Sequence, residues 1–202
     1  MENFVITIAR GFGSGGRTIG KMLSESMNIP FYDKDLIKLA SEESGINLAL
    51  FGKSDEKVKS GLFGKPKVYS GELAAPDSSD FVSEENLFGY QAKVIKSLAD
   101  KGSCIIVGRC ADFVLKDREN VVKTFIWADM PTCIKNAKEV CGLDEREAEK
   151  RIERIDKERS AYYKAHTGNE WDNVRNYDLC LNTSRLSFEK CVEIIRNYID
   201  IL

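Results

Sequence analysis

The sequence predicts an α/β protein whose parallel sheet is covered by helices on both faces. The first observation is that short apolar runs rich in β-branched residues alternate with segments of helical periodicity. The second is a glycine cluster at residues 11–16, placed between the first apolar run and the first helical segment. The third is size, because 202 residues with 43% hydrophobic content suit one domain with a sizeable core.

Each expected strand is a short, mostly apolar run bounded by turn or charged residues. The strands are expected at residues 4–8, 29–33, 103–109, 121–128 and 177–182, which makes a five-stranded sheet. The helices are expected from residue 18, after residue 33, near 87–102, from 131 to about 140, within 144–176 and from 187. Pro131 and Ser187 are typical of helix starts.

One segment, residues 46–83, differs from this pattern. Glycine, proline, serine and charged residues are mixed there with weak periodicity. We therefore expect a mobile segment or a small lobe between the second helix and the helix near residue 87.

Composition narrows the class of partner and the compartment. A formal net charge of −2 gives no overall attraction to nucleic acid or to a membrane, so neither partner is expected. Six cysteines without a C-x-x-C pair favour a reduced, cytoplasmic protein over a disulfide framework. The apolar run at the N-terminus is too short for a signal peptide. His166 is expected at the surface, near the end of the charged helix.

The glycine cluster has two interpretations. Gly11, Gly13 and Gly16 form the G-x-G-x-x-G of a dinucleotide-binding turn, and Asp33 lies roughly where a ribose-binding acid would be. Residues 11–18 also form the phosphate loop G-x-x-x-x-G-K-[ST], with arginine at position 17 in place of lysine. A hydroxyl after a basic residue suits Mg²⁺ and phosphate, and a dinucleotide turn needs neither. The loop alone favours phosphoryl transfer over hydride transfer only modestly.

Basic residues downstream favour the phosphate-loop interpretation. Arg151 and Arg154 are three residues apart and share a helix face, and Arg159 lies roughly 80° further round. Residues 144–176 lie between the fourth and fifth expected strands, where a lid could close over a nucleotide. Such a lid would bring positive charge to the phosphoryl group and exclude water. A solvated, salt-bridged helix is the alternative.

Arg109 places a charge at the end of a buried strand. The carboxyl ends of parallel strands are where open α/β sheets bind ligands, and phosphate binding would explain this arginine. An ion pair with Asp112 or Asp33 is the alternative explanation.

Six stretches together resemble the cytidylate kinase-like family, a branch of the P-loop nucleoside monophosphate kinases. They are ITIARGFGSGGRTIGKML, IPFYDKDLI, CIIVGRCADFVL, FIWADMP, RIERIDKERSAYYKAHTG and YDLCLNTSRLS. The resemblance implies a three-layer α/β/α P-loop fold over residues 1–202, with an acceptor-binding lobe near 46–90 and a lid near 144–176. It implies transfer of the γ-phosphoryl group of ATP, with Mg²⁺, to a nucleoside monophosphate, of which CMP or dCMP fits best.

The resemblance also implies a role for individual residues. The donor phosphates would lie on Gly11, Gly13, Ser14, Gly15, Gly16, Arg17 and Thr18. Thr18 would bind Mg²⁺, and Asp33 would face the phosphates or the outer shell of the ion. Arg109 would hold the acceptor's phosphate. The lid would supply Arg151, Arg154 and Arg159, and the loop beside the donor base would contain Asn182, Thr183 and Ser184.

The chain departs from the family pattern at two motifs. Typical members have lysine where this chain has Arg17, and their GRD motif is here Gly108-Arg109-Cys110, with the acid lost or displaced to Asp112. Three other functions stay open. They are a nucleotide-binding regulatory protein without turnover, a kinase of another small metabolite, and an NAD-dependent oxidoreductase.

Overall fold

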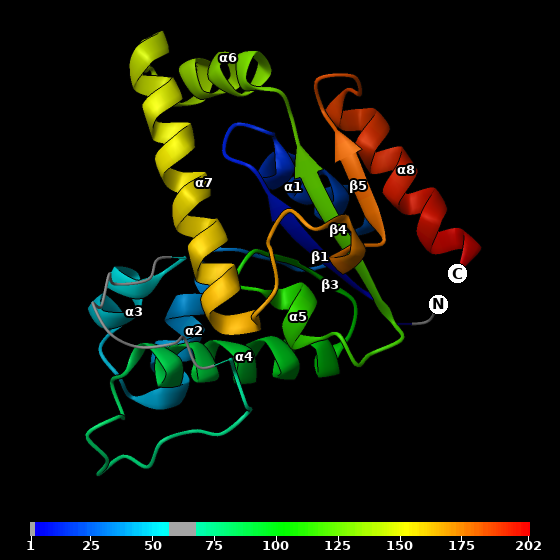
Figure 1. The fold of residues 1–202 in the computed structure, drawn as a ribbon. Coiled ribbons are helices and arrows are strands. Elements are labelled where there is room, and N and C mark those ends of the chain that lie inside the picture. Colours follow the sequence, from blue (N-terminus) through cyan, green and yellow to red (C-terminus); the bar gives the residue numbers. More distant parts are fainter. Residues whose placement is uncertain (1–2, 57–67) are drawn as a thin grey trace.

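The computed structural model describes residues 3–56 and 68–202, and Figure 1 shows their arrangement. Part of the expected mobile segment, residues 57–67, lies outside the described residues. The strands are β1 (Val5–Arg10), β2 (Phe31–Tyr32), β3 (Cys104–Val107), β4 (Val121–Trp127) and β5 (Leu179–Asn182). The helices are α1 (Gly16–Met27), α2 (Asp35–Ser44), α3 (Leu48–Ser54), α4 (Glu84–Lys101), α5 (Ala111–Val114), α6 (Met130–Cys141), α7 (Glu145–Thr167) and α8 (Phe188–Ile201), with a 3₁₀ turn at Val174–Asn176.

The five strands form one parallel sheet in the order β2-β3-β1-β4-β5. β1 lies in the centre, where Val5 is opposite both Cys104 and Val121. Because the strands are parallel, the loops that follow them meet at one edge of the sheet. The expected α/β fold with five parallel strands is confirmed.

The two faces of the sheet have separate apolar cores, because alternate side chains of β1 point to opposite faces. On one face, Ile6 and Ile8 pack with α1 and α8 through Ile19, Leu23 and Ile195. On the other face, Val5 packs in a core shared by helices α2, α3, α4, α5 and α7. No helix in the described ranges is both long and apolar enough to cross a membrane.

The long helix α7 extends from α6 to the region of α4 and α5 (Figure 1). Asp144 and Glu147 form a capping box at its start. Its first half packs only a small apolar cluster against α6, through Ala148 and Ile152. Its second half buries Tyr162 and Tyr163 in the core of the sheet. The C-terminal half of the expected lid is therefore anchored.

The expectation of a surface histidine is wrong. His166 is buried in the last turn of α7, and its ring stacks on Phe88 with 4.1 Å between centroids. Burial lowers the pKa of His166 to about 4, so the ring is neutral at pH 7. The charged sequence around this turn conceals that one face of it enters the core.

Candidate active site

The loop between β1 and α1 has a backbone path that only glycine permits. Gly13 and Gly15 have positive φ angles of 81° and 82°. A Cβ at Gly13 would lie 2.5 Å from the carbonyl oxygen of Cys133, and one at Gly15 would lie 2.3 Å from the ring of Phe188. The two glycines therefore let the loop pack directly against α6 and α8.

Side chains from neighbouring elements bind the carbonyl oxygens of this loop. Asn136 donates to the carbonyl of Gly13 at 2.7 Å, and the hydroxyl of Thr183 donates to that of Ser14 at 2.8 Å. The Ser14 hydroxyl in turn donates to the carbonyl of Gly11 at 2.8 Å. These bonds fix the orientation of successive peptide groups, so the loop is rigid before any ligand binds.

The N–H groups of the same loop are mostly unused. Within the described ranges, no hydrogen bond is donated by the N–H groups of Gly13, Gly15, Gly16, Arg17 or Thr18. A row of free N–H groups at the start of a helix is a ready anion site. Phe12 is different, because its N–H donates to Asp156 of α7 at 2.8 Å.

Arg17 and Arg109 meet at one carboxylate, that of Asp33, just after β2. Nε of Arg17 and Nη1 of Arg109 each lie 2.7 Å from an oxygen of Asp33. Arg109 also makes two bonds to Asp55, of 3.0 and 2.8 Å, and its side chain is only 2% exposed. Burial alone would lower the pKa of Arg109, but the charges of Glu56, Asp55 and Asp33 raise it above its ordinary value. The ion pair with Asp33 is thus present, and Arg109 also lies at the expected edge of the sheet.

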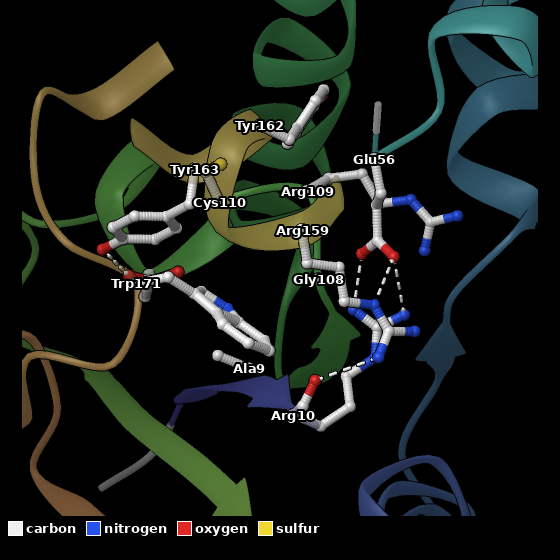
Figure 2. Close-up of a pocket in the computed structure, with 11 residues that line it drawn as sticks. Ala9, Arg10, Glu56, Gly108, Arg109, Cys110, Arg159, Tyr162, Tyr163 and Trp171 are labelled. Atoms are coloured by element: carbon white, nitrogen blue, oxygen red, sulfur yellow. Dashed lines mark hydrogen bonds and ion pairs between the residues drawn. The ribbon is translucent and has the colours of Figure 1, made fainter. Parts of the chain in front are cut away.

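A second group of ion pairs surrounds Glu56 (Figure 2). Its carboxylate accepts hydrogen bonds from Arg10 at the end of β1 and from Nε of Arg159 in α7. Burial would raise the pKa of Glu56, but Arg10, Arg159 and Arg109 outweigh it and hold this pKa far below its usual range. Glu56 is therefore a fixed negative charge among arginines.

The three arginines expected in the lid have different surroundings. Arg159 donates to the carbonyl oxygen of Arg10 at 3.1 Å, and the Arg151 guanidinium lies 5.4 Å from the ring centre of Phe12 in the phosphate loop. Arg154 pairs instead with Glu158 at 3.0 Å, and its side chain is 56% exposed. The structure therefore brings two of the three to the loop and leaves Arg154 facing solvent.

Residues 182–184, at the end of β5 and just after it, lie beside the phosphate loop. Thr183 bonds the loop itself through Ser14. Asn182 accepts the N–H of Ser184, and the Ser184 hydroxyl accepts the N–H of Asp129 at 2.7 Å. In this structure the three side chains hold the loop after β5 in place.

The residues near the loop fit a magnesium ion that arrives with nucleotide phosphates. The Thr18 side chain is exposed in the first turn of α1, and both oxygens of Asp33 already accept from arginines. No cluster of three metal-binding side chains occurs in the described ranges. Magnesium commonly takes one or two protein oxygens together with phosphate oxygens, which Thr18 and an indirect contact through Asp33 could supply.

Sequence reasoning missed four residues of this site: Arg10, Asp55, Glu56 and Asp156. Arg10 carried a usable signal, because it is a charge at the end of a buried strand, as Arg109 is.

Asp112, the residue to which the family's acid could be displaced, accepts a hydrogen bond from the Tyr163 hydroxyl at 2.6 Å. Burial raises the pKa of Asp112 to about 6.

The fold and the site together define a class of protein. A parallel sheet with a glycine-rich anion-binding loop after its central strand, and arginines at the same edge, is a P-loop kinase fold. The chain belongs to the cytidylate kinase-like family, whose model matches residues 5–185.

Individual relatives agree with this family. The chain is 28% identical to a cytidylate kinase of Methanopyrus kandleri, over 97% of this chain and 93% of that one. The crystal structure of an uncharacterized protein from Eubacterium ventriosum is 28% identical, with a TM-score of 0.72 and 98% of both chains covered. A shikimate kinase from Bacteroides thetaiotaomicron shares the fold at 14% identity, with a TM-score of 0.54 and 98% of both chains covered. The family and the cytidylate kinase relative support a nucleotide kinase, and the two solved structures support the fold.

Proposed function

We propose that this protein transfers the γ-phosphoryl group of ATP to a nucleoside monophosphate, with CMP or dCMP as the first candidates. One observation carries the proposal: the free N–H groups of Gly13 and of residues 15–18 lie at the same sheet edge as Arg17, Arg109 and Arg159. This edge offers backbone and guanidinium donors to two phosphorylated ligands. Membership of the cytidylate kinase-like family supports the nucleotide as acceptor.

In this proposal the phosphate loop binds the donor. Its free N–H groups would hold the donor phosphates, and Arg17 would supply the positive charge that lysine supplies in typical members of the family. The Arg17 side chain is 55% exposed, and its Nε is held by Asp33, so its terminal nitrogens can reach a ligand. Mg²⁺ bound with the phosphates near Thr18 would neutralise part of their charge. The protein would act by positioning and electrostatics, without a covalent intermediate.

The acceptor's phosphate would bind Arg109, and the lid would supply Arg151 and Arg159. Arg109 is already paired on both sides, so the phosphate would have to replace Asp55 while Asp33 stays as the orienting partner. We assign residues 46–90 to the acceptor-binding lobe and residues 144–176 to the lid. The lid's mobile part would be the first half of α7, whose apolar packing is a small cluster with α6 and Phe12 of the phosphate loop. Arg154 would join the site only on such a movement.

The chemistry of the cysteines supports a cytoplasmic location, which we include in the proposal. All six are free, and four of them are buried. Burial raises the pKa of Cys104 and of Cys133 to about 11, so both thiols stay protonated and unreactive at neutral pH.

The test is a phosphoryl-transfer assay with Mg-ATP and a panel of acceptors that contains CMP, dCMP, UMP, other nucleoside monophosphates and small metabolites. The purified protein should phosphorylate CMP or dCMP best. Arg17→Met should lower kcat/KM by roughly 10² to 10³, since it removes one charged donor from the transferred group. Arg118→Met is the matched control, because Arg118 pairs with Asp100 away from the site.

Other results would point to the other functions. Saturable ATP binding without product would indicate a regulatory protein, and transfer to a different acceptor would keep the chemistry but change the substrate. If no acceptor in the panel is phosphorylated and ATP does not bind, the proposal is wrong.

A further inference from the structure

The carboxylate of Glu56 lies in a position that suits a phosphate. Nη1 and Nη2 of Arg10 lie 2.5 and 3.2 Å from its two oxygens, and Nε of Arg159 lies 3.1 Å from one of them. Figure 2 shows these guanidinium groups converging on the carboxylate from β1 and α7. Arginine's planar fork fits carboxylate and phosphate oxygens alike, so the groups that hold Glu56 form an anion subsite.

The backbone around this subsite is adapted to the carboxylate. Glu56 has a φ of 53°, a left-handed conformation that is unfavourable for a residue with a Cβ. At Gly108, a Cβ would lie 2.1 Å from Oε1 of Glu56 and 2.3 Å from Nη1 of Arg10. The missing side chain at Gly108 therefore makes room for the ion pair, and the ion pair holds Glu56 in a strained conformation.

A buried hydroxyl beside the subsite has no partner. Tyr162 is 3% exposed, and its hydroxyl makes no hydrogen bond within the described ranges. It lines a cavity of 20 Å³ together with Glu56, Arg10 and Arg159, and this volume holds about one water molecule. A phosphate group cannot enter this cavity while Glu56 stays in place.

The arginines and carboxylates around Glu56 and Asp33 form one network of ion pairs, and its net charge is zero only because Asp55 and Glu56 belong to it. Four arginines and four carboxylates make up the network: Arg10, Arg17, Arg109, Arg159, Asp33, Asp55, Glu56 and Asp156. Asp55 and Glu56 are neighbours in the chain and would move together. Without them the network has two uncompensated positive charges, which match the dianion of a phosphate monoester.

We propose that Arg10 and Arg159 form a binding subsite for the phosphate of a phosphate monoester, and that Glu56 occupies this subsite until the ligand displaces it. The identification of that monoester with the acceptor or product of phosphoryl transfer rests on the proposed function. Arg10 thereby joins the phosphate-binding residues, and Glu56 is an internal competitor of the ligand.

Titration with inorganic phosphate, followed by calorimetry, tests this subsite. Glu56→Gln removes the competing charge while keeping the side chain's volume, and it should tighten phosphate binding about tenfold. Glu43→Gln removes an equal charge from an exposed ion pair with Lys93 and should leave the affinity unchanged. Thermal unfolding of each variant checks that the fold is kept.

The location of the anion is tested by combining variants. In an Arg10→Gln background the gain from Glu56→Gln should disappear, because the donor that the phosphate would use is absent. Where Arg10→Gln does not fold, Arg10→Lys keeps the charge but loses the fork, and it should reduce the gain at least threefold. A gain that persists without Arg10 would place the anion on the phosphate loop, and this result would overturn the inference. Unchanged or weaker phosphate binding by Glu56→Gln would overturn it too.

The outcome is separable from that of the kinase assay, since inorganic phosphate needs no acceptor. A failed kinase assay with the expected phosphate titrations would leave the subsite standing and refute the reaction. An active kinase whose Glu56→Gln variant binds phosphate no better would leave the reaction standing and refute the subsite.

Discussion

Asp112 and His166 are two buried side chains whose protonation should make stability depend on pH in opposite directions. Burial raises the pKa of Asp112 to about 6 and lowers that of His166 to about 4. Between about pH 4 and 6 the folded protein holds more protons on Asp112 than the unfolded chain does, so stability falls as pH rises. Between about pH 4 and 6.5 the unfolded chain holds more protons on His166 than the folded protein does. This effect makes the free energy of unfolding rise as the pH rises.

Single variants should separate the two effects. Relative to the wild type, Asp112→Asn should make the free energy of unfolding rise more steeply from pH 4 to 6, and His166→Phe should make it fall. Each group accounts for a change on the order of 3 kcal/mol across its window, because one pKa unit corresponds to about 1.4 kcal/mol. Urea unfolding at several pH values from 4 to 7 measures both slopes. If the free energy of unfolding changes equally with pH in both variants, other titratable groups control stability between pH 4 and 7.

Single residues also show where sequence reasoning succeeds. Arg109 and Arg17 were predictable because each occupies a defined place, at a strand end or in a loop motif. The partner of Arg10, Glu56, was not, because it is 46 residues away in a segment without periodicity. His166 was misplaced because burial of one helix turn depends on the helix it meets, here α4 through Phe88.

At the scale of elements, a carboxylate of α7 accepts a hydrogen bond from the phosphate loop. Asp156 accepts the N–H of Phe12 at 2.8 Å and lies 3.6 Å from Arg159. Burial raises the pKa of Asp156, and the Phe12 N–H opposes this rise. The charged pattern of α7 predicted a helix near the site, but it did not show that an acid would contact the loop.

Removing this carboxylate should loosen the loop. Asp156→Ala should increase the amide exchange rate of Phe12 at least tenfold in hydrogen exchange, since a net hydrogen bond to a charged group corresponds to about 1.5–3 kcal/mol. Glu153→Ala is the matched control, because Glu153 lies exposed on the same helix. If Phe12 exchanges equally in both variants, Asp156 does not hold the loop.

At the scale of the whole molecule, ligand binding should stabilise the fold by mass action. A nucleotide at about a hundred times its Kd adds about 2.7 kcal/mol to the free energy of unfolding. For a chain of this size that corresponds to a rise in Tm of roughly 5–10 °C. Thermal shift with Mg-ATP and with CMP should show such a rise, and NAD should show none. A rise with NAD alone would favour the oxidoreductase interpretation.

The fold class was predictable because a buried parallel sheet requires continuous apolar runs, and the five runs are plain in the sequence. The expected strands all appear, together with each expected helix. Two short helices, α3 and α5, were not expected, because helices of 7 and 4 residues show too few turns for a periodic pattern. Strand order is set by packing of distant segments, which local patterns do not encode.

The central position of β1 affects how the protein can fold during synthesis. Val5 pairs with Cys104 on one side and with Val121 on the other, so the first strand made has no partner until more than half of the chain exists. At about 5–20 residues per second, the ribosome needs on the order of ten seconds to supply those strands. Throughout that time an apolar strand with two open edges emerges in the cell, and a chaperone that binds extended apolar segments would have its strongest target in residues 5–9.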